Sequence, residues 1–156
     1  MVTATETIGR SRGLVGLGAL PAFELPGVDG DPVRSWDYRS REHLVVALAG
    51  HDPDLSALEE VARRERDVRA EDAAVLVVLH ADQTRARELW ERAGRPGHGL
   101  VDAEGRVHSR LGAGGEAELL VVDRDGTIYW RAGLSEAPAA RLLDEALSWL
   151  QYMNIL

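Results

Sequence analysis

Two apolar stretches, His43–Ala49 (HLVVALA) and Ala73–Leu79 (AAVLVVL), decide the fold of this chain. Both are rich in valine, leucine and alanine, which is typical of strands that are buried on both faces, as in a parallel sheet. Between them, apolar residues recur at helical spacing from Leu55 onward, and Asp54 stands where a helix N-cap is expected. Two buried strands joined by a helix predict a right-handed parallel crossover.

The remaining elements continue this pattern to the end of the chain. Hydrophobic periodicity and turn formers predict a helix at 83–93 that opens at Asp82, segments at 97–101 and 107–111 around a turn, a hairpin of strands at 118–122 and 127–131, and a closing helix at 136–150. The core order is therefore β-α-β-α-β-β-α. Ahead of it, extended segments at 22–25 and 33–36 flank a cluster of turn formers, which predicts an N-terminal hairpin.

We expect one domain at 17–151, between a flexible tail at 1–16 and an apolar tail at 152–156. Of the 156 residues, 45% are hydrophobic and 28% are charged, which is a globular composition. The net charge of -8 would repel a phosphate backbone, so no nucleic-acid partner is expected. No apolar run suits a signal peptide or a membrane span, which predicts a soluble, cytoplasmic protein without a membrane partner.

The chain contains no cysteine, which excludes disulfides, thiolate metal sites and thiol redox chemistry by its own side chains. A glycine-rich run at 112–115 lacks the Gly-Lys-Ser/Thr ending of a phosphate-binding loop, and it precedes a strand rather than a helix. No cofactor is therefore expected.

Three stretches carry a resemblance to a known family. They are GALPAFELPGVDG at 18–30, LVDAEGRV at 100–107 with Leu-Gly at 111–112, and LVVDRDGTI at 120–128. In this order they resemble the peroxiredoxin-like family of alkyl hydroperoxide reductases and thiol-specific antioxidants, the redoxin domain, over residues 17–150. The resemblance implies an α/β, thioredoxin-like fold, with a central mixed sheet flanked by helices and an N-terminal hairpin.

The resemblance also implies a family activity, thiol-dependent peroxide or disulfide oxidoreduction, with a nucleophile at the start of the first core helix. On a thioredoxin pattern Asp54 and Ala57 take the cysteine positions, and on a peroxiredoxin pattern Leu58 takes the cysteine position and Leu55 that of its hydroxyl neighbour. The family's arginine, or the cis-proline of thioredoxins, falls near Ala117. We therefore expect no catalytic residue and no thiol peroxidase activity in the former active-site segment, which consists of His51, Asp52, Pro53, Asp54, Leu55, Ser56, Ala57 and Leu58.

Metal binding or acid–base chemistry, which needs no cysteine, could use the same edge of the sheet. Polar residues follow both core strands, whose carboxyl ends meet at one edge of a parallel sheet, where ligands bind in such folds. Imidazoles and carboxylates there could ligate a divalent metal or act as acid and base; the candidates are His51, Asp52, Asp54, His80 and Asp82. The structural interpretation is that the aspartates at 54 and 82 are helix caps and that all these histidines, with His98 and His108, are solvated surface residues.

Three functions are compatible with this pattern. The first is a binding or interaction module that has lost its redox chemistry. The second is a cysteine-independent enzyme or metal-binding protein that uses the His51 and His80 edge. The third is a structural partner, either a homodimer or a contact with another protein through the C-terminal tail or the active-site face.

Overall fold

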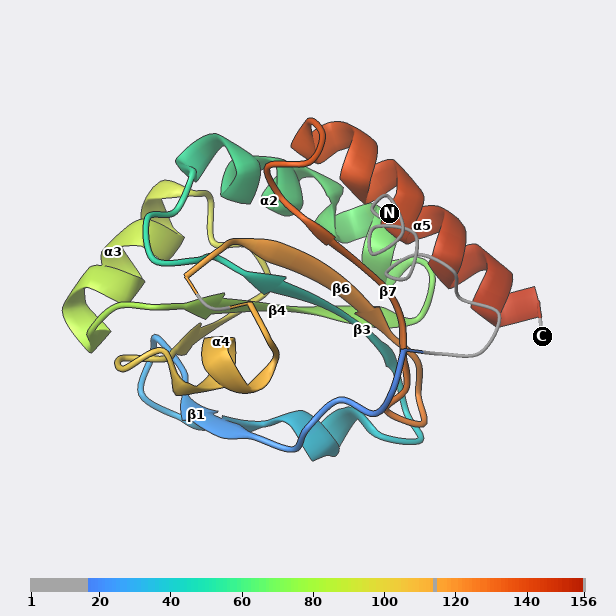
Figure 1. Cartoon of the computed structure of the whole chain (residues 1–156), viewed down its shortest axis with the longest axis horizontal. Helices are drawn as coiled ribbons and strands as arrows, with labels where there is room; N and C mark the ends of the chain where they lie inside the picture. The colour runs from blue at the N-terminus through green and yellow to red at the C-terminus, as the bar shows by residue number, and fades with distance from the viewer. Residues whose placement is uncertain (1–16, 114, 156) are drawn as a thin grey trace.

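The computed structural model describes residues 17–113 and 115–155. A five-stranded sheet in the order β5-β4-β3-β6-β7 forms its centre (Figure 1). The elements are β1 (Glu24–Pro26), β2 (Pro32–Arg34), the 3-10 helix η1 (Ser35–Tyr38), β3 (His43–Leu48), α2 (Leu55–Arg69), β4 (Ala73–Leu79), α3 (Gln83–Arg92), β5 (His98–Val101), α4 (Arg106–Arg110), β6 (Glu118–Val122), β7 (Ile128–Gly133) and α5 (Ala139–Ile155).

The sheet is mixed. Strands β3, β4 and β5 are parallel, whereas β6 and β7 run antiparallel to their neighbours. Every residue of β3 and of β4 is buried, and their side chains alternate between two apolar clusters. Val45 and Ala47 belong to one cluster, whereas Leu44 and Val46 belong to the other. These two strands therefore need cover on both faces, as their unbroken apolar sequence predicts.

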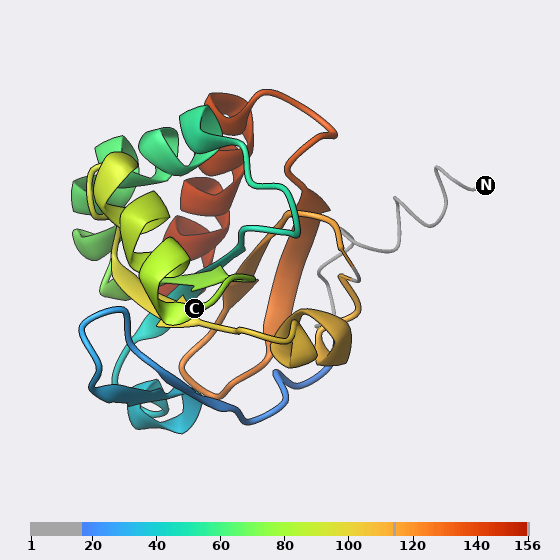
Figure 2. The same ribbon diagram turned by 90° about the vertical axis from the view of Figure 1, so that its left-hand side faces the viewer.

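Different layers cover the two faces. Helices α2, α3 and α5 lie on one side of the sheet, and the β1–β2 hairpin, η1 and α4 lie on the other (Figure 1). The view turned by 90° shows the same division, with the hairpin and η1 below the sheet and the long helices above it (Figure 2). Among the described residues, no helix has the length and apolar character that a membrane span requires.

The predicted core order and the N-terminal hairpin are confirmed, and β5 adds a parallel edge strand. The sequence pattern assigns no helix or strand to the segment at 107–111, and in the structure residues 106–110 form the short helix α4. Its first turn is stabilised by the Asp102 carboxylate, which accepts hydrogen bonds from the amides of Val107 (3.2 Å) and His108 (3.0 Å). The predicted tail at 1–16 lies outside the described residues.

The closing helix α5 continues past its predicted end, through the segment at 152–155. Met153 is buried in the core, whereas Ile155 is 81% exposed. The Asn154 side chain ties this last turn to the sheet, because its carbonyl oxygen lies 2.8 Å from Nε2 of the buried His43 and its amide donates to the backbone oxygen of Glu71. The last described turn is thus part of the domain, and it presents Tyr152 and Ile155 on the surface.

Candidate functional site

The candidate site lies at the carboxyl ends of β3 and β4, the edge where the sequence predicts it. We call the residues that gather there, His51, Asp52, Asp54, His80 and Asp82, the mouth. The loop after β3 supplies the first three, and the loop after β4 supplies the other two. Asp52 and His51 are exposed, whereas His80 is partly buried.

The two predicted helix caps are confirmed. Asp54 accepts hydrogen bonds from the Ser56 amide (3.0 Å) and the Ser56 hydroxyl (2.7 Å) at the start of α2. The bond from the Ser56 side chain, with those from the backbone, lowers the pKa of Asp54. Asp82 accepts from the amide of Arg85 (2.8 Å) at the start of α3. Both carboxylates therefore satisfy backbone donors of a helix N-terminus and complement its positive dipole.

Apolar side chains occupy the inner positions of the former active-site segment. Leu58 is 1% exposed and Ala57 is 7% exposed, and Leu58 belongs to the helix-side core. Leu55 packs against this core, and Pro53 is half-buried. The positions that the family resemblance assigns to a reactive thiol and its neighbours thus carry a capping carboxylate or core packing.

Three histidine rings form a row at the mouth. The ring centroids of His51 and His80 lie 5.1 Å apart, and those of His80 and His108 lie 5.5 Å apart. Exposure falls along the row, from the exposed His51 to the fully buried His108. The row therefore leads from solvent into the interior.

The expectation that His108 is a surface residue is wrong, although His98 is exposed as expected. Nδ1 of His108 lies 2.8 Å from Oδ2 of the buried Asp102, and its Nε2 accepts a hydrogen bond from the Gly50 amide (3.0 Å). Because the amide can only donate, Nε2 must be unprotonated and Nδ1 must carry the hydrogen that is donated to Asp102. His108 is thus a structural bridge, with both nitrogens engaged, rather than a free base.

Close backbone contacts fix the surroundings of the row. A Cβ on Gly105, whose φ is +71°, would lie 2.6 Å from Cε1 of His80, so the glycine leaves space for that ring. A Cβ on Gly50, whose φ is +81°, would lie 2.8 Å from the Ala117 amide nitrogen. The position near which the resemblance places an arginine or cis-proline therefore packs directly on the end of β3, and the described residues contain no cis peptide bond.

An arginine does lie near this edge, but its charge is already paired. Arg131 of β7 donates from Nε to Oε1 of the buried Glu118 (2.8 Å), and its Nη2 donates to the backbone oxygen of Leu111. Glu118 pairs in register with Leu48 at the end of β3. The guanidinium therefore contributes to packing between strands and α4, and it is not free to bind an anion at the mouth.

One buried nitrogen of the row has no partner within the described residues. Nδ1 of His80 is buried and makes no hydrogen bond there. In the same described ranges, no group of three histidine, aspartate or glutamate side chains is placed to hold a metal ion. The mouth can therefore offer the imidazoles of His51 and His80 as a pair, and the described side chains do not complete a metal coordination sphere by themselves.

Sequence reasoning missed Asp102 and the bridge from His108. The contact between Asp102 and α4 has a local signal in the sequence. Asp102 precedes Gly105 in a turn, and an aspartate in that position can accept hydrogen bonds from the first amides of a following helix. The contact between His108 and the Gly50 amide has no local signal, since the two residues are 58 positions apart in the chain.

Comparisons with known proteins find similarity to solved structures alone. No protein-family model matches the sequence, and no curated protein matches it significantly. The structure is similar to that of peroxidoxin BcpB from Mycobacterium tuberculosis, with a TM-score of 0.76 at 19% identity over 88% of this chain and 97% of that one. It is also similar to a putative thiol:disulfide interchange protein DsbE from Chlorobium tepidum, with a TM-score of 0.73 at 19% identity over 88% and 99% of the two chains.

A third similar structure is AhpC from Enterococcus faecalis, with a TM-score of 0.72 at 15% identity over 90% of this chain and 93% of that one. The three similarities extend over 88–90% of this chain. The fold is therefore thioredoxin-like, as the sequence resemblance predicts.

The bridge from His108 to Asp102 and Gly50 makes the free energy of unfolding depend on pH. Burial lowers the pKa of His108, and the contact with Asp102 offsets this only in part. The unfolded chain takes up a proton at this histidine near pH 6.5, whereas the folded chain does so only at lower pH. The free energy of unfolding should therefore fall as pH falls below about 6.5, by at most about 1.4 kcal/mol per pH unit from this group.

The variant His108→Gln tests this dependence by denaturant unfolding at a series of pH values. Glutamine can still accept from the Gly50 amide but cannot titrate, so the variant should show a shallower fall of stability on acidification than the wild type. The exposed His98→Gln is the control and should keep the wild-type slope. Equal slopes for wild type and His108→Gln would show that this histidine does not determine the acid response.

Proposed function

We propose that this chain is a redox-inactive member of the peroxiredoxin-like group that acts as a binding module. One observation carries the proposal. The N-terminus of α2, which would stabilise a thiolate, is capped by the carboxylate of Asp54, and Leu58 one turn later is buried in the core. A carboxylate with a lowered pKa is a weak nucleophile toward peroxide and cannot form a sulfenic acid or a disulfide.

The geometry of the mouth supports binding as the remaining role. His51 and Asp52 are exposed on the loop after β3. Two backbone hydrogen bonds hold this loop in place: the Gly50 amide donates to Nε2 of His108, and the His51 amide donates to the Gly115 oxygen (2.9 Å). Exposed polar side chains on a rigid loop are a common basis for recognition, since little conformational entropy is lost on binding. In open α/β sheets in general, ligands bind outside the carboxyl ends of the strands, where the mouth lies.

The first test measures turnover of hydrogen peroxide with a dithiol reductant. The purified chain should consume peroxide no faster than buffer, because it has no thiol that peroxide could oxidise to a sulfenic acid and the dithiol could then reduce, with release of water. Rates are compared at equal protein concentration with a cysteine-containing peroxiredoxin as the positive control. Thiol-dependent turnover that follows the purified protein would overturn the redox-inactive part of the proposal.

The second test asks whether the mouth is the binding face. A partner captured by the immobilised wild-type chain should be lost with the double variant His51→Ala/Asp52→Ala, both of whose side chains are exposed and play no part in the core. The matched control is His98→Ala, because His98 is an exposed histidine at the start of β5, the opposite edge of the sheet. Retention of the partner by the double variant would place the contact elsewhere.

Metal binding is a second candidate function, favoured by the approach of His51 and His80. Their ring centroids lie 5.1 Å apart, and Nδ1 of His80 has no partner among the described residues. Imidazole pairs suit zinc, copper and nickel, with solvent or a partner supplying the other ligands.

Calorimetric titration with zinc ions distinguishes this candidate. If the pair binds the metal, His51→Ala should weaken zinc binding by about tenfold or more, whereas His98→Ala should leave it unchanged. Equal affinities for wild type and His51→Ala would reject a metal role for the mouth, without bearing on binding of a protein partner.

A further inference from the structure

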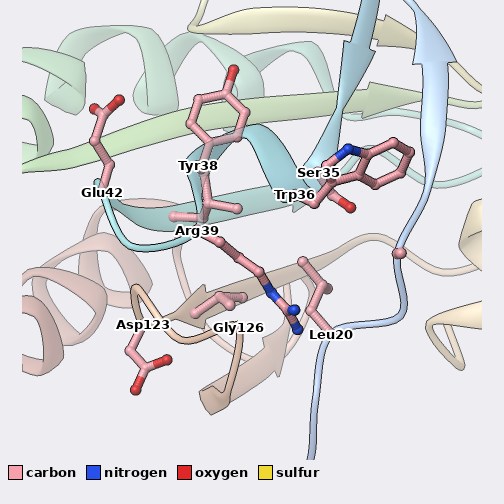
Figure 3. A pocket seen from close by; sticks show the side chains of 11 residues that line it. Leu20, Ser35, Trp36, Tyr38, Arg39, Glu42, Asp123 and Gly126 are labelled. Atoms are coloured by element: carbon pink, nitrogen blue, oxygen red, sulfur yellow. The ribbon is translucent and has the colours of Figure 1, made fainter.

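A cavity lies at the other end of β3 from the mouth, between the sheet and η1 (Figure 3). Its volume is about 140 Å³. Buried side chains of Leu20, Leu44 and Val122 form its apolar part. This volume is close to that of the ~150 Å³ cavity that accommodates benzene in an engineered protein core, so the space suits a single aromatic ring.

An unpaired cation lines the cavity. Arg39 is exposed, and within the described chain its guanidinium makes neither an ion pair nor a hydrogen bond. The side chain extends toward Leu20 and Gly126 (Figure 3). A Cβ on Gly126 would lie 3.0 Å from Nε of Arg39, so this glycine, whose φ is +86°, lets the guanidinium lie close to the backbone. All five donors of this group remain available to a planar acceptor such as a carboxylate.

A buried hydroxyl adds a second donor. Ser35 is 6% exposed and lines the same cavity, and its Oγ accepts a hydrogen bond from the Phe23 amide (2.9 Å). No described residue accepts the hydroxyl hydrogen of Ser35. Because a hydroxyl can donate as well as accept, this hydrogen is available to an acceptor in the cavity.

An exposed indole completes the wall. Trp36 is 44% exposed, although tryptophan is usually largely buried. It belongs to η1, next to Ser35, and both line the cavity (Figure 3). An aromatic ligand could stack on this indole while its ring displaces water from the apolar part.

Two carboxylates at the rim limit the charge of the ligand. Asp123 is engaged in its own turn, because Oδ1 accepts from the amides of Asp125 and Thr127 (2.9 Å each). Glu42 lines the cavity without an ion pair among the described residues. These negative charges disfavour a ligand with more than one anionic group and tolerate an amino group.

We propose that this cavity binds a small aromatic monocarboxylate. The carboxylate would accept hydrogen bonds from Arg39 and Ser35, and the ring would pack on Trp36 and the apolar part beside Leu20. The site is separate from the mouth, so its test is independent of the proposed function.

Titration of the isotope-labelled full chain with phenylacetate, followed by amide NMR, tests the proposal. Saturable shifts are expected at the amides of Leu20 and Gly126. Arg39→Gln should weaken binding about tenfold or more, because it removes a charge-assisted hydrogen bond. The control Arg41→Gln, an exposed arginine outside the cavity lining, should bind as the wild type does.

Two further ligands separate the contributions of the groups. Benzylamine, which carries the ring without the carboxylate, should bind more weakly than phenylacetate. Phenylalanine should bind at the same amides, and tighter binding than phenylacetate would identify the α-amino form as the better ligand. The proposal is overturned by the absence of saturable shifts, by equal affinity for Arg39→Gln and wild type, or by tighter binding of benzylamine than of phenylacetate.

Discussion

The burial of β3 on both faces and along both edges is the constraint on which the rest of the structure depends. Its neighbours β4 and β6 satisfy its backbone groups, and its side chains alternate between two apolar clusters. A strand of this kind requires a helical layer on one side and the hairpin, η1 and α4 on the other. Both candidate sites follow from it, since the mouth lies at its carboxyl end and the cavity beside η1 at its amino end.

Much of the fold could be predicted because the relevant signals are local. The apolar run of β4 gives its bounds without error, and the caps at Asp54 and Asp82 come from hydrogen bonds that span two or three residues. The convergence of His51 and His80 follows from topology, because parallel neighbours end at the same edge. What these predictions share is that each needs only the residue itself, its near neighbours and the order of the strands.

The parts that could not be predicted depend on contacts between distant residues. Helix α4 has five residues and little hydrophobic periodicity. It forms where the Asp102 carboxylate accepts hydrogen bonds from the first amides of the helix. The burial of His108 requires the Gly50 amide as a second partner, and no spacing within the sequence indicates that meeting. The cavity beside η1 is likewise a property of packing, since Leu20, Ser35 and Val122 come together only when the hairpin covers the sheet.

The carboxylate cap at Asp54 also changes how the stability of the protein depends on the redox potential of its surroundings. A thiolate at a helix N-terminus stabilises the protein only while it is reduced and ionised, so the stability of a redox protein shifts with the potential of its compartment. A carboxylate fills the same electrostatic role at any potential. With no cysteine in the chain and Asp54 at this terminus, the charge at the start of α2 does not depend on the oxidation state of a thiol.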